Sequence, residues 1–173
     1  MEYLNLKITL PIPQEFSLPK PMMKYINENP QKPIAYYKLA KSCKYFYYKN
    51  HVIVSHFAKT HDYIWEVLAF DADWTGFDAP SVDLENFPCK IWILNFLTCY
   101  EEVDIKELIP KVYRCDVNSL HLEEQKISFK DFLFLSGSVN DIEFKRVQIS
   151  YDDGSMVLLE TILNSLKNII SFD

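Results

Sequence analysis

The chain has 173 residues, of which 49% are hydrophobic and 15% aromatic, and this composition excludes a disordered chain as the default state. The three glycines are too few and too far apart for a phosphate-binding loop or a dinucleotide-binding turn. No apolar run reaches the roughly 18 residues of a membrane span, and residues 1–9 lack a signal-peptide pattern. The four cysteines are widely spaced and favour free thiols, so we expect a globular protein of the cytoplasm or nucleus.

The charge is divided unevenly along the chain. Residues 1–50 hold eight lysines and three glutamates, a net charge of +5, whereas residues 51–173 hold 10 basic and 21 acidic residues, a net charge of −11. Between Asp62 and Glu85 there are seven acidic residues and no basic one. This asymmetry predicts two segments with different partners, and it argues against nucleic acid as the partner of the longer segment.

The first 50 residues predict an extended lead-in and then a compact module of two helices. The run Leu18-Pro19-Lys20-Pro21 is typical of a helix start, because the first turn tolerates proline. Pro30 ends this first helix. A second, amphipathic helix is predicted from Ile34 to Lys49, where apolar residues recur at spacings of three and four.

The remainder alternates strand-like and helix-like segments. Residues 51–57 have the β-branched content of a strand, and residues 71–90, with prolines, a glycine and aspartates, predict a long loop. Beyond them the sequence predicts strands at 90–96, 119–122, 141–144 and 169–172, and helices at 101–112, 128–135 and 156–168.

The predicted strands are spaced like repeats. Their apolar pairs recur at intervals within the range of leucine-rich repeats, which is roughly 20–29 residues. The pairs are Ile91/Ile93, Leu120/Leu122, Ile142/Phe144 and Ile170/Phe172. Each strand–helix unit of such an array buries its apolar face by stacking on its neighbours. We therefore expect a mixed α+β or α/β chain with a lead-in at 1–15, a helical module at 16–50 and a short leucine-rich-repeat-like array at 51–173. An ordinary α/β domain with irregular spacing is the alternative.

Residues 18–46 resemble an F-box. The family pattern begins with Leu-Pro, continues with an aliphatic first helix, and ends the second helix in Cys-Lys/Arg-x-aromatic. The matching residues here are Leu18, Pro19, Met22, Ile26, Leu39 and the run Cys43-Lys44-Tyr45-Phe46. The runs Val112–Asp116, Ile127–Phe129 and Phe132–Leu135 are similar to those of the expanded nematode F-box group, which extends the resemblance over most of the chain.

The resemblance implies an F-box-like helical module in a substrate-recruiting adaptor of a cullin-based (SCF) ubiquitin ligase. Residues 18–46 would bind an acidic Skp-type adaptor and through it a cullin, while the C-terminal region would hold a target protein. An F-box needs only an apolar helical face that completes a groove on its partner. The implied partner-binding residues, which equally suit the module's own core, are Leu18, Pro19, Met22, Ile26, Leu39, Cys43 and Phe46. The alternative is an interaction or sequestering module with an F-box-like fold that engages no ligase.

Histidine and cysteine patterns give little indication of chemistry. His51, His56 and His61 are spaced five apart, which suits metal pairs on neither helices nor strands. Cys99 and His121 could belong to a thiol triad, but no local motif supports one.

An acidic stretch partly matches a calcium-binding loop. Asp71, Asp73 and Asp78 supply carboxylates and Gly76 stands at the sixth position, but Val82 occupies the place of the chelating glutamate. This stretch therefore predicts no calcium site. Taken together with the composition, the charge and the histidine and cysteine patterns, the sequence leads us to expect no metal, no cofactor, no nucleic acid or membrane partner, and no enzymatic activity.

Overall fold

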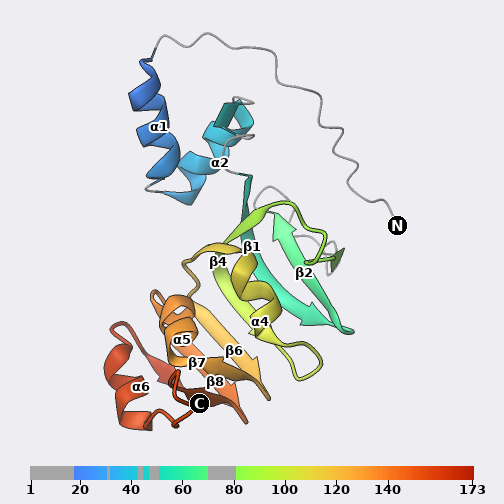
Figure 1. Cartoon of the computed structure of the whole chain (residues 1–173), viewed down its shortest axis with the longest axis vertical. Helices are drawn as coiled ribbons and strands as arrows, with labels where there is room; N and C mark the ends of the chain where they lie inside the picture. Colours follow the sequence, from blue (N-terminus) through green and yellow to red (C-terminus); the bar gives the residue numbers. More distant parts are fainter. Residues whose placement is uncertain (1–17, 31, 43–44, 47–50, 70–80) are drawn as a thin grey trace. The chain divides into compact units, whose positions relative to one another are not determined.

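The structure is a computed structural model that describes residues 18–30, 32–42, 45–46, 51–69 and 81–173. The chain forms two compact units, residues 1–51 and 52–173 (Figure 1). The described part of the first unit is helical, and the second unit combines helices with a mostly parallel sheet. The expectation of a mixed α/β chain is therefore confirmed. The expected lead-in at 1–15 lies outside the described residues, and the expected division into three segments stays a prediction.

In the first unit, α1 (Lys20–Glu28) begins and ends at residues with clear capping roles. Pro19 is the N-cap, and its carbonyl oxygen accepts the N–H groups of Met22 at 2.9 Å and Met23 at 3.1 Å. The helix ends at Asn29, whose backbone leaves the helical region with φ of −127° and ψ of 56°, while its Nδ2 donates to the carbonyl of Tyr25 at 3.0 Å. The second helix, α2 (Pro33–Ser42), is shorter than the predicted span of 34–49, part of which lies outside the described residues.

The second unit is built on one large sheet with the order β10-β8-β6-β4-β1-β2-β3, in which β5 also pairs with β4. All pairs are parallel except β1–β2 and β2–β3, which are antiparallel. The strands are β1 (Val52–His61), β2 (Ile64–Ala69), β3 (Ser81–Val82), β4 (Lys90–Cys99), β5 (Val112–Cys115), β6 (Ser119–Glu123), β8 (Asp141–Lys145) and β10 (Ser171–Phe172).

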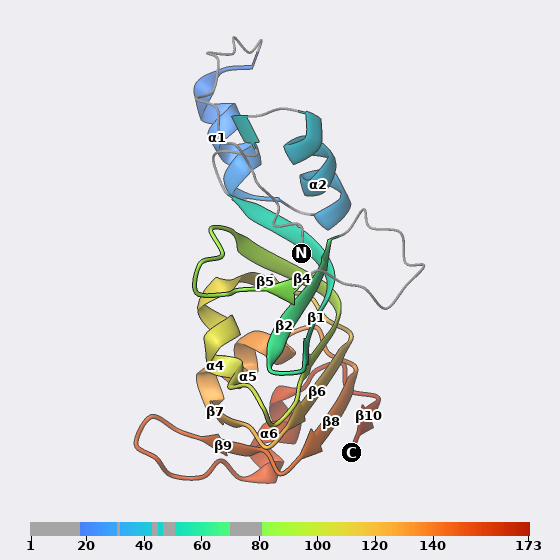
Figure 2. The same ribbon diagram turned by 90° about the vertical axis from the view of Figure 1, so that its right-hand side faces the viewer.

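Short elements complete each crossover between the parallel strands. Figure 2 shows the helices on one side of the main sheet: α4 (Ile105–Leu108), followed by a 3-10 turn (Ile109–Lys111), α5 (Phe129–Ser136) and α6 (Leu159–Ser165). A second, two-stranded parallel sheet joins β7 (Lys126–Ser128) to β9 (Gln148–Ser150). Two successive coils thus follow one path: a strand of the main sheet, a strand of the small sheet, and a helix.

The register of the parallel strands repeats, but not on the residues that the sequence predicts. Leu97, Leu120, Ile142 and Phe172 lie side by side, so the first two intervals are nearly equal and the last is longer. The sequence predicts that the pair Ile91/Ile93 belongs to this row, and that prediction is wrong. These two residues lie beside β5, and Leu97 of the same strand takes their place in the row. The predicted pair Ile170/Phe172 is out of register, since Phe172 and not Ile170 pairs with Ile142, and the side chain of Ile170 is 85% exposed.

The longer last interval has a single local cause. In the first coil α5 follows β7 directly, whereas in the second coil Tyr151–Leu158 stand between β9 and α6. This segment contains a turn in which Gly154 adopts a φ of 83° and the N–H of Tyr151 donates to the carbonyl of Ser155 at 2.9 Å. Without the segment, both coils would have nearly the same length.

Several predicted elements of the second unit have different bounds in the structure. The helix predicted at 101–112 is limited to α4 and the 3-10 turn, because Asp104 caps its start and Pro110 lacks the N–H that a longer helix needs. Val112 therefore begins β5. The helix predicted at 156–168 is shortened to α6. The strand predicted at 51–57 continues to His61 and turns back into β2 through Asp62 and Tyr63, whose φ angles are 48° and 66°.

A row of asparagines runs from the middle of β4 to the starts of β6 and β8. Asn95, Asn118 and Asn140 each lie one position before the aligned strand segments. The N–H of Asn118 donates to the carbonyl of Asn95 at 2.8 Å, and that of Asn140 to Asn118 at 3.0 Å. Ile170, whose N–H donates to Asn140 at 2.7 Å, holds the next position, so the row ends there.

A buried glutamine lies beyond the opposite end of β6. Gln125 follows β6, is almost fully buried, and its Oε1 accepts the N–H of Ile105 at 2.9 Å. Its Nε2 lies within 3.1 Å of the carbonyl oxygens of Tyr100, Val103 and Glu123. One amide therefore fixes the turn between β4 and α4. Without it the N–H of Ile105 would lose its partner, and the carbonyl of Val103 would keep only the thiol of Cys99.

Candidate functional site

Helix α1 carries apolar side chains on two faces, and only one face is buried. Met23 is 3% exposed and Asn27 lies on the same buried side. Leu18 is 43% exposed, Met22 is 51% exposed, and Tyr25 is exposed as well. Met22 and Tyr25 are three apart and share one side of α1, and Leu18 is exposed just before the Pro19 N-cap, outside the helix. We call Leu18, Met22 and Tyr25 the open α1 face.

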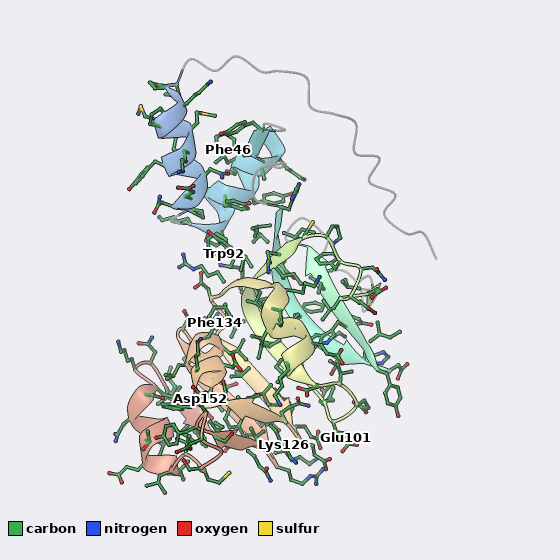
Figure 3. The ribbon with its side chains drawn as sticks, in the orientation of Figure 1. Phe46, Trp92, Glu101, Lys126, Phe134 and Asp152 are labelled. Atoms are coloured by element: carbon green, nitrogen blue, oxygen red, sulfur yellow. The ribbon has the colours of Figure 1, made fainter. Side chains whose placement is uncertain are left out.

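The residues expected to bind a partner fall into three groups. Leu18, Pro19 and Met22 are exposed, and Pro19 also provides the N-cap of α1. Ile26 and Leu39 are half-buried. Phe46, labelled in Figure 3, is buried, and its ring meets that of Tyr45 edge-on at 5.3 Å. Cys43 lies outside the described residues. The exposed group can meet a partner directly, whereas Phe46 supports the fold of the unit.

Two exposed apolar residues were missed by the sequence-based assignment. Tyr25 belongs to the open α1 face, and Ile34 is exposed in the first turn of α2. The spacing of Leu18, Met22 and Tyr25 was available in the sequence. Because Met22 and Met23 are equally apolar neighbours, the sequence alone did not show which of the two faces outward.

The second unit presents polar side chains on the face of the sheet opposite its buried leucines. Three directly opposed pairs connect β6 to β8. Ser119 Oγ donates to Asp141 at 3.0 Å, His121 Nδ1 lies 3.4 Å from Glu143, and Lys145 contacts Glu123. The bond from Lys145 holds the pKa of Glu123 below its usual range. We call these residues the β6–β8 pairs.

Arg146 joins the turns at one edge of this face. Its guanidinium lies 2.5 Å from Glu124, 3.4 Å from Glu123 and 3.7 Å from Glu101, which is labelled in Figure 3. Glu124 and Arg146 occupy equivalent positions in successive coils, directly after β6 and β8, and both have left-handed backbones, with φ of 54° and 56°. The single arginine therefore offsets part of the repulsion among three carboxylates.

The described cysteines lack the features of nucleophiles. Cys99 is buried and its thiol donates to the carbonyl of Val103 at 3.2 Å. Burial raises its pKa far above the usual thiol range, and burial raises the pKa of Cys115 to about 12. His121 pairs with Glu143 and packs edge-on against Tyr100. These contacts give no support to a thiol triad.

The residues that the structure describes contain neither a metal-binding cluster nor a membrane-spanning helix. No group of three or more His, Cys, Asp or Glu side chains within it is arranged to hold a metal ion. The candidate calcium ligands between Asp71 and Asp78 lie outside the described residues. None of the described helices combines the length and apolar character needed to cross a bilayer.

Comparisons with known proteins identify no relatives. No family model matches the chain, and no curated protein or solved structure is significantly similar to it. The open α1 face and the surfaces of the second unit are therefore the candidate binding sites of this chain.

Proposed function

We propose that this protein is an F-box-type adaptor that recruits a target protein to a cullin-based ubiquitin ligase. Residues 18–46 dock on a Skp-type adaptor, and the second unit holds the target. The adaptor acts by proximity, because holding a target beside a charged conjugating enzyme raises its effective concentration. No residue of this chain needs to take part in bond making or breaking.

The observation that carries the proposal is the open α1 face. Packing of the first unit leaves Leu18 and Met22 exposed although Met23 of the same helix is buried. Met22 and Tyr25 are exposed at helical spacing on α1, and Leu18 is exposed directly before its N-cap. Exposed apolar side chains on and beside a short helix are the usual means by which it completes a partner's groove. The net charge of +5 over residues 1–50 suits the acidic adaptor that the family resemblance implies.

The second unit suits the target-holding role in this proposal. Its parallel strands recur at nearly equal intervals over β4, β6 and β8, as in a short leucine-rich-repeat-like array. The β6–β8 pairs place carboxylates, a lysine and a histidine on one accessible sheet face. Such a surface recognises a protein by hydrogen bonds and charge.

A second candidate function is an interaction or sequestering module that engages no ligase. It is favoured by the end of α1, where the next position along the open face is Asn29, which caps the helix instead of adding an apolar contact. The open α1 face is therefore short. In this second function the open α1 face is too short to bind a Skp-type adaptor and binds another partner.

Co-purification tests the proposal directly. The full chain should retain a Skp-type adaptor and, with it, a cullin. Replacing Leu18 and Met22 together by lysine removes two apolar anchors of about 1–2 kcal/mol each, which weakens retention by roughly 30- to 800-fold. Both side chains are exposed, so the first unit should keep its helical circular dichroism.

A matched control carries the same substitutions on another exposed apolar pair. Leu133 and Phe134 of α5 are exposed to a similar degree, and their replacement by lysine should leave adaptor retention unchanged. Failure of the unaltered chain to retain the adaptor, or equal retention by the Leu18→Lys, Met22→Lys variant, would contradict the ligase proposal and favour the second candidate.

A further inference from the structure

Asp153 and Gly154 lie in an exposed turn of the segment between β9 and α6. They form the only aspartate–glycine pair in the sequence. Oδ1 of Asp153 accepts the backbone N–H of Ser155 at 2.9 Å and its hydroxyl at 2.6 Å. The bond from the N–H closes an Asx-turn, which folds the carboxyl group back over the peptide bond to Gly154. The turn therefore keeps this carboxyl group near the amide nitrogen that follows it.

Gly154 leaves its own amide nitrogen accessible. Its φ of 83° lies in the left-handed region that favours glycine. Among the described residues outside its chain neighbours, no heavy atom lies within 4 Å of the position that a Cβ atom would take at Gly154. No side chain of the described part of the chain therefore obstructs the approach of this nitrogen to the carboxyl carbon of Asp153.

We propose that Asp153–Gly154 is a site of spontaneous covalent modification, at which Asp153 is converted to isoaspartate. The amide nitrogen of Gly154 bonds to the side-chain carboxyl carbon of Asp153 in its protonated form. The amide proton and the carboxyl hydroxyl leave together as water, and a cyclic imide forms. Water then adds to the main-chain carbonyl carbon of Asp153 and breaks its bond to the Gly154 nitrogen. The main chain now runs through the former side chain, and no oxidant or reductant is consumed.

Two sets of contacts in the native turn affect the rate. The N–H of Gly154 donates to the carbonyl of Tyr151 at 3.0 Å, and releasing this exposed bond slows the reaction by at most about tenfold. The bonds from Ser155 hold the pKa of Asp153 below its usual range, which depletes the reactive acid form. The same donors stabilise the oxyanion that forms during the attack, and groups that bind both states alike change the rate little. We therefore expect the native chain to react within about tenfold of a peptide of the same sequence.

Isomerisation weakens the anchoring of the segment that precedes α6. In isoaspartate the remaining carboxylate is attached directly to Cα, so it no longer reaches over the turn to Ser155. The following residues are held by a β-bridge between Met156 and Ser150 and by the N–H of Val157, which donates to the carbonyl of Ile149 at 3.0 Å. A main chain lengthened by one methylene shifts these residues against β9. The proposal is independent of adaptor docking through the first unit.

Ageing of the full chain in heavy-oxygen water at neutral pH tests the proposal. Hydrolysis of the imide inserts a heavy oxygen atom, so the peptide that contains Asp153 should gain mass and separate into aspartyl and isoaspartyl forms. Asp141 provides the internal control, because this exposed aspartate is followed by the β-branched Ile142 within β8. Equal labelling at Asp141 and Asp153 would overturn the proposal. Absence of label at Asp153, under conditions in which a synthetic peptide of residues 151–158 reacts, would also overturn it.

A matched variant tests the ring closure. Asp153→Glu keeps the carboxylate but places its carbon one methylene further from the Gly154 nitrogen, so labelling should fall at least about tenfold. Asp153→Asn should form the same imide with loss of ammonia and give the same two products. A glutamate variant that is labelled like the unaltered chain would contradict imide formation through Gly154.

Hydrogen exchange tests the effect on the fold. In the purified isoaspartyl form, the amide of Val157 should exchange at least about tenfold faster than in the unmodified chain, because the turn has lost its bonds to Ser155. The amide of Leu122, which is buried in β6, should keep its rate. Equal exchange at Val157 in the two forms would overturn the loss of anchoring.

Discussion

Replacing Gln125 by leucine tests how much one buried amide contributes to the stability of the second unit. The Oε1 atom of Gln125 accepts the N–H of Ile105, the first residue of α4. Its Nε2 supplies hydrogen bonds to the turn that precedes α4, including one of 2.9 Å to the carbonyl of Val103. Leucine has a similar volume but neither donor nor acceptor. The substitution therefore removes these bonds without opening a large cavity.

The expected cost follows from the groups left behind. The N–H of Ile105 loses its partner inside the protein, and the carbonyl of Val103 keeps only the weak thiol donor of Cys99. Each buried group without a partner costs about 1–3 kcal/mol, and the extra apolar burial of leucine returns part of this. We expect a net loss of about 2–4 kcal/mol in the free energy of unfolding, which is a large fraction of a typical total of about 5–15 kcal/mol.

Urea denaturation measures this loss. The fluorescence of Trp92, which is fully buried in the second unit, should report unfolding of that unit. With an m-value near about 2 kcal/mol/M, the midpoint should fall by about 1–2 M. Gln148→Leu is the control, because Gln148 is exposed on β9 and its replacement should change stability by no more than about 0.5 kcal/mol. A loss below about 1 kcal/mol for Gln125→Leu, or equal losses in both variants, would refute the reasoning.

Two further predictions concern titrating groups of the second unit. Because Lys145 lowers the folded-state pKa of Glu123, the stabilisation is complete above the unfolded-state pKa and is lost as the pH falls through the lower folded-state value. Glu123→Gln should therefore flatten the acid side of a plot of Tm against pH, and an unchanged acid side would contradict the assigned cause. Cys99 and Cys115 should resist alkylation at pH 8 in the native protein, since a thiol with a pKa of about 12 is thiolate in only about one molecule in 10,000. Mass spectrometry measures the alkylation of each thiol in the native protein and in urea. Equal alkylation rates in the two conditions would show that burial does not protect the thiol.

Strands in which apolar and polar residues clearly alternate were predictable from the sequence. The segments 119–122 and 141–144 place apolar residues at every second position, and the structure buries Leu120, Leu122 and Ile142 as that pattern requires. Helix α5 also lies close to its predicted span of 128–135, because Ser128 caps it by accepting the N–H of Asp131.

The missed strands lack such local patterns. In β7 and β9 only the central residues, Ile127 and Ile149, are buried, so these short strands show no alternation to detect. The β1–β2 hairpin turns through Asp62 and Tyr63, which adopt left-handed conformations without a glycine. In a sequence, a turn of this type is normally indicated by asparagine or glycine. Neither residue is present here, so the sequence did not indicate that β1 ends at this point.

The register of β4 could not be read from the sequence because the strand has two sets of neighbours. Its first half pairs with β5 and its second half with β6. Ile91 and Ile93 in the first half and Leu97 and Cys99 in the second are all buried, so each half shows a plausible apolar pair. Only the pairing of distant strands selects Leu97 for the repeating row.

Two residues of the candidate docking site, Leu18 and Met22, were predicted from the sequence, but Tyr25 was missed and the exposure of all three could not be predicted. Leu18 and Met22 are identified by their position around the helix start, Leu18 before the N-cap and Met22 in the first turn of α1. Whether these side chains face solvent or the interior depends on how α1 packs within its unit. The burial of Phe46 shows that family-like residues can serve the fold as well as a partner surface.

The segment Tyr151–Leu158 contributes to the surface of the second unit but not to its repeating fold. The first coil closes without any counterpart to this segment, so the fold has no need of it. Yet it carries Met156 and Leu158, two of the most exposed apolar residues of the unit. A lineage could therefore gain or lose this patch by a single insertion or deletion between β9 and α6. Relatives of this chain that share the coils but lack the segment would keep the scaffold and lose this exposed apolar patch.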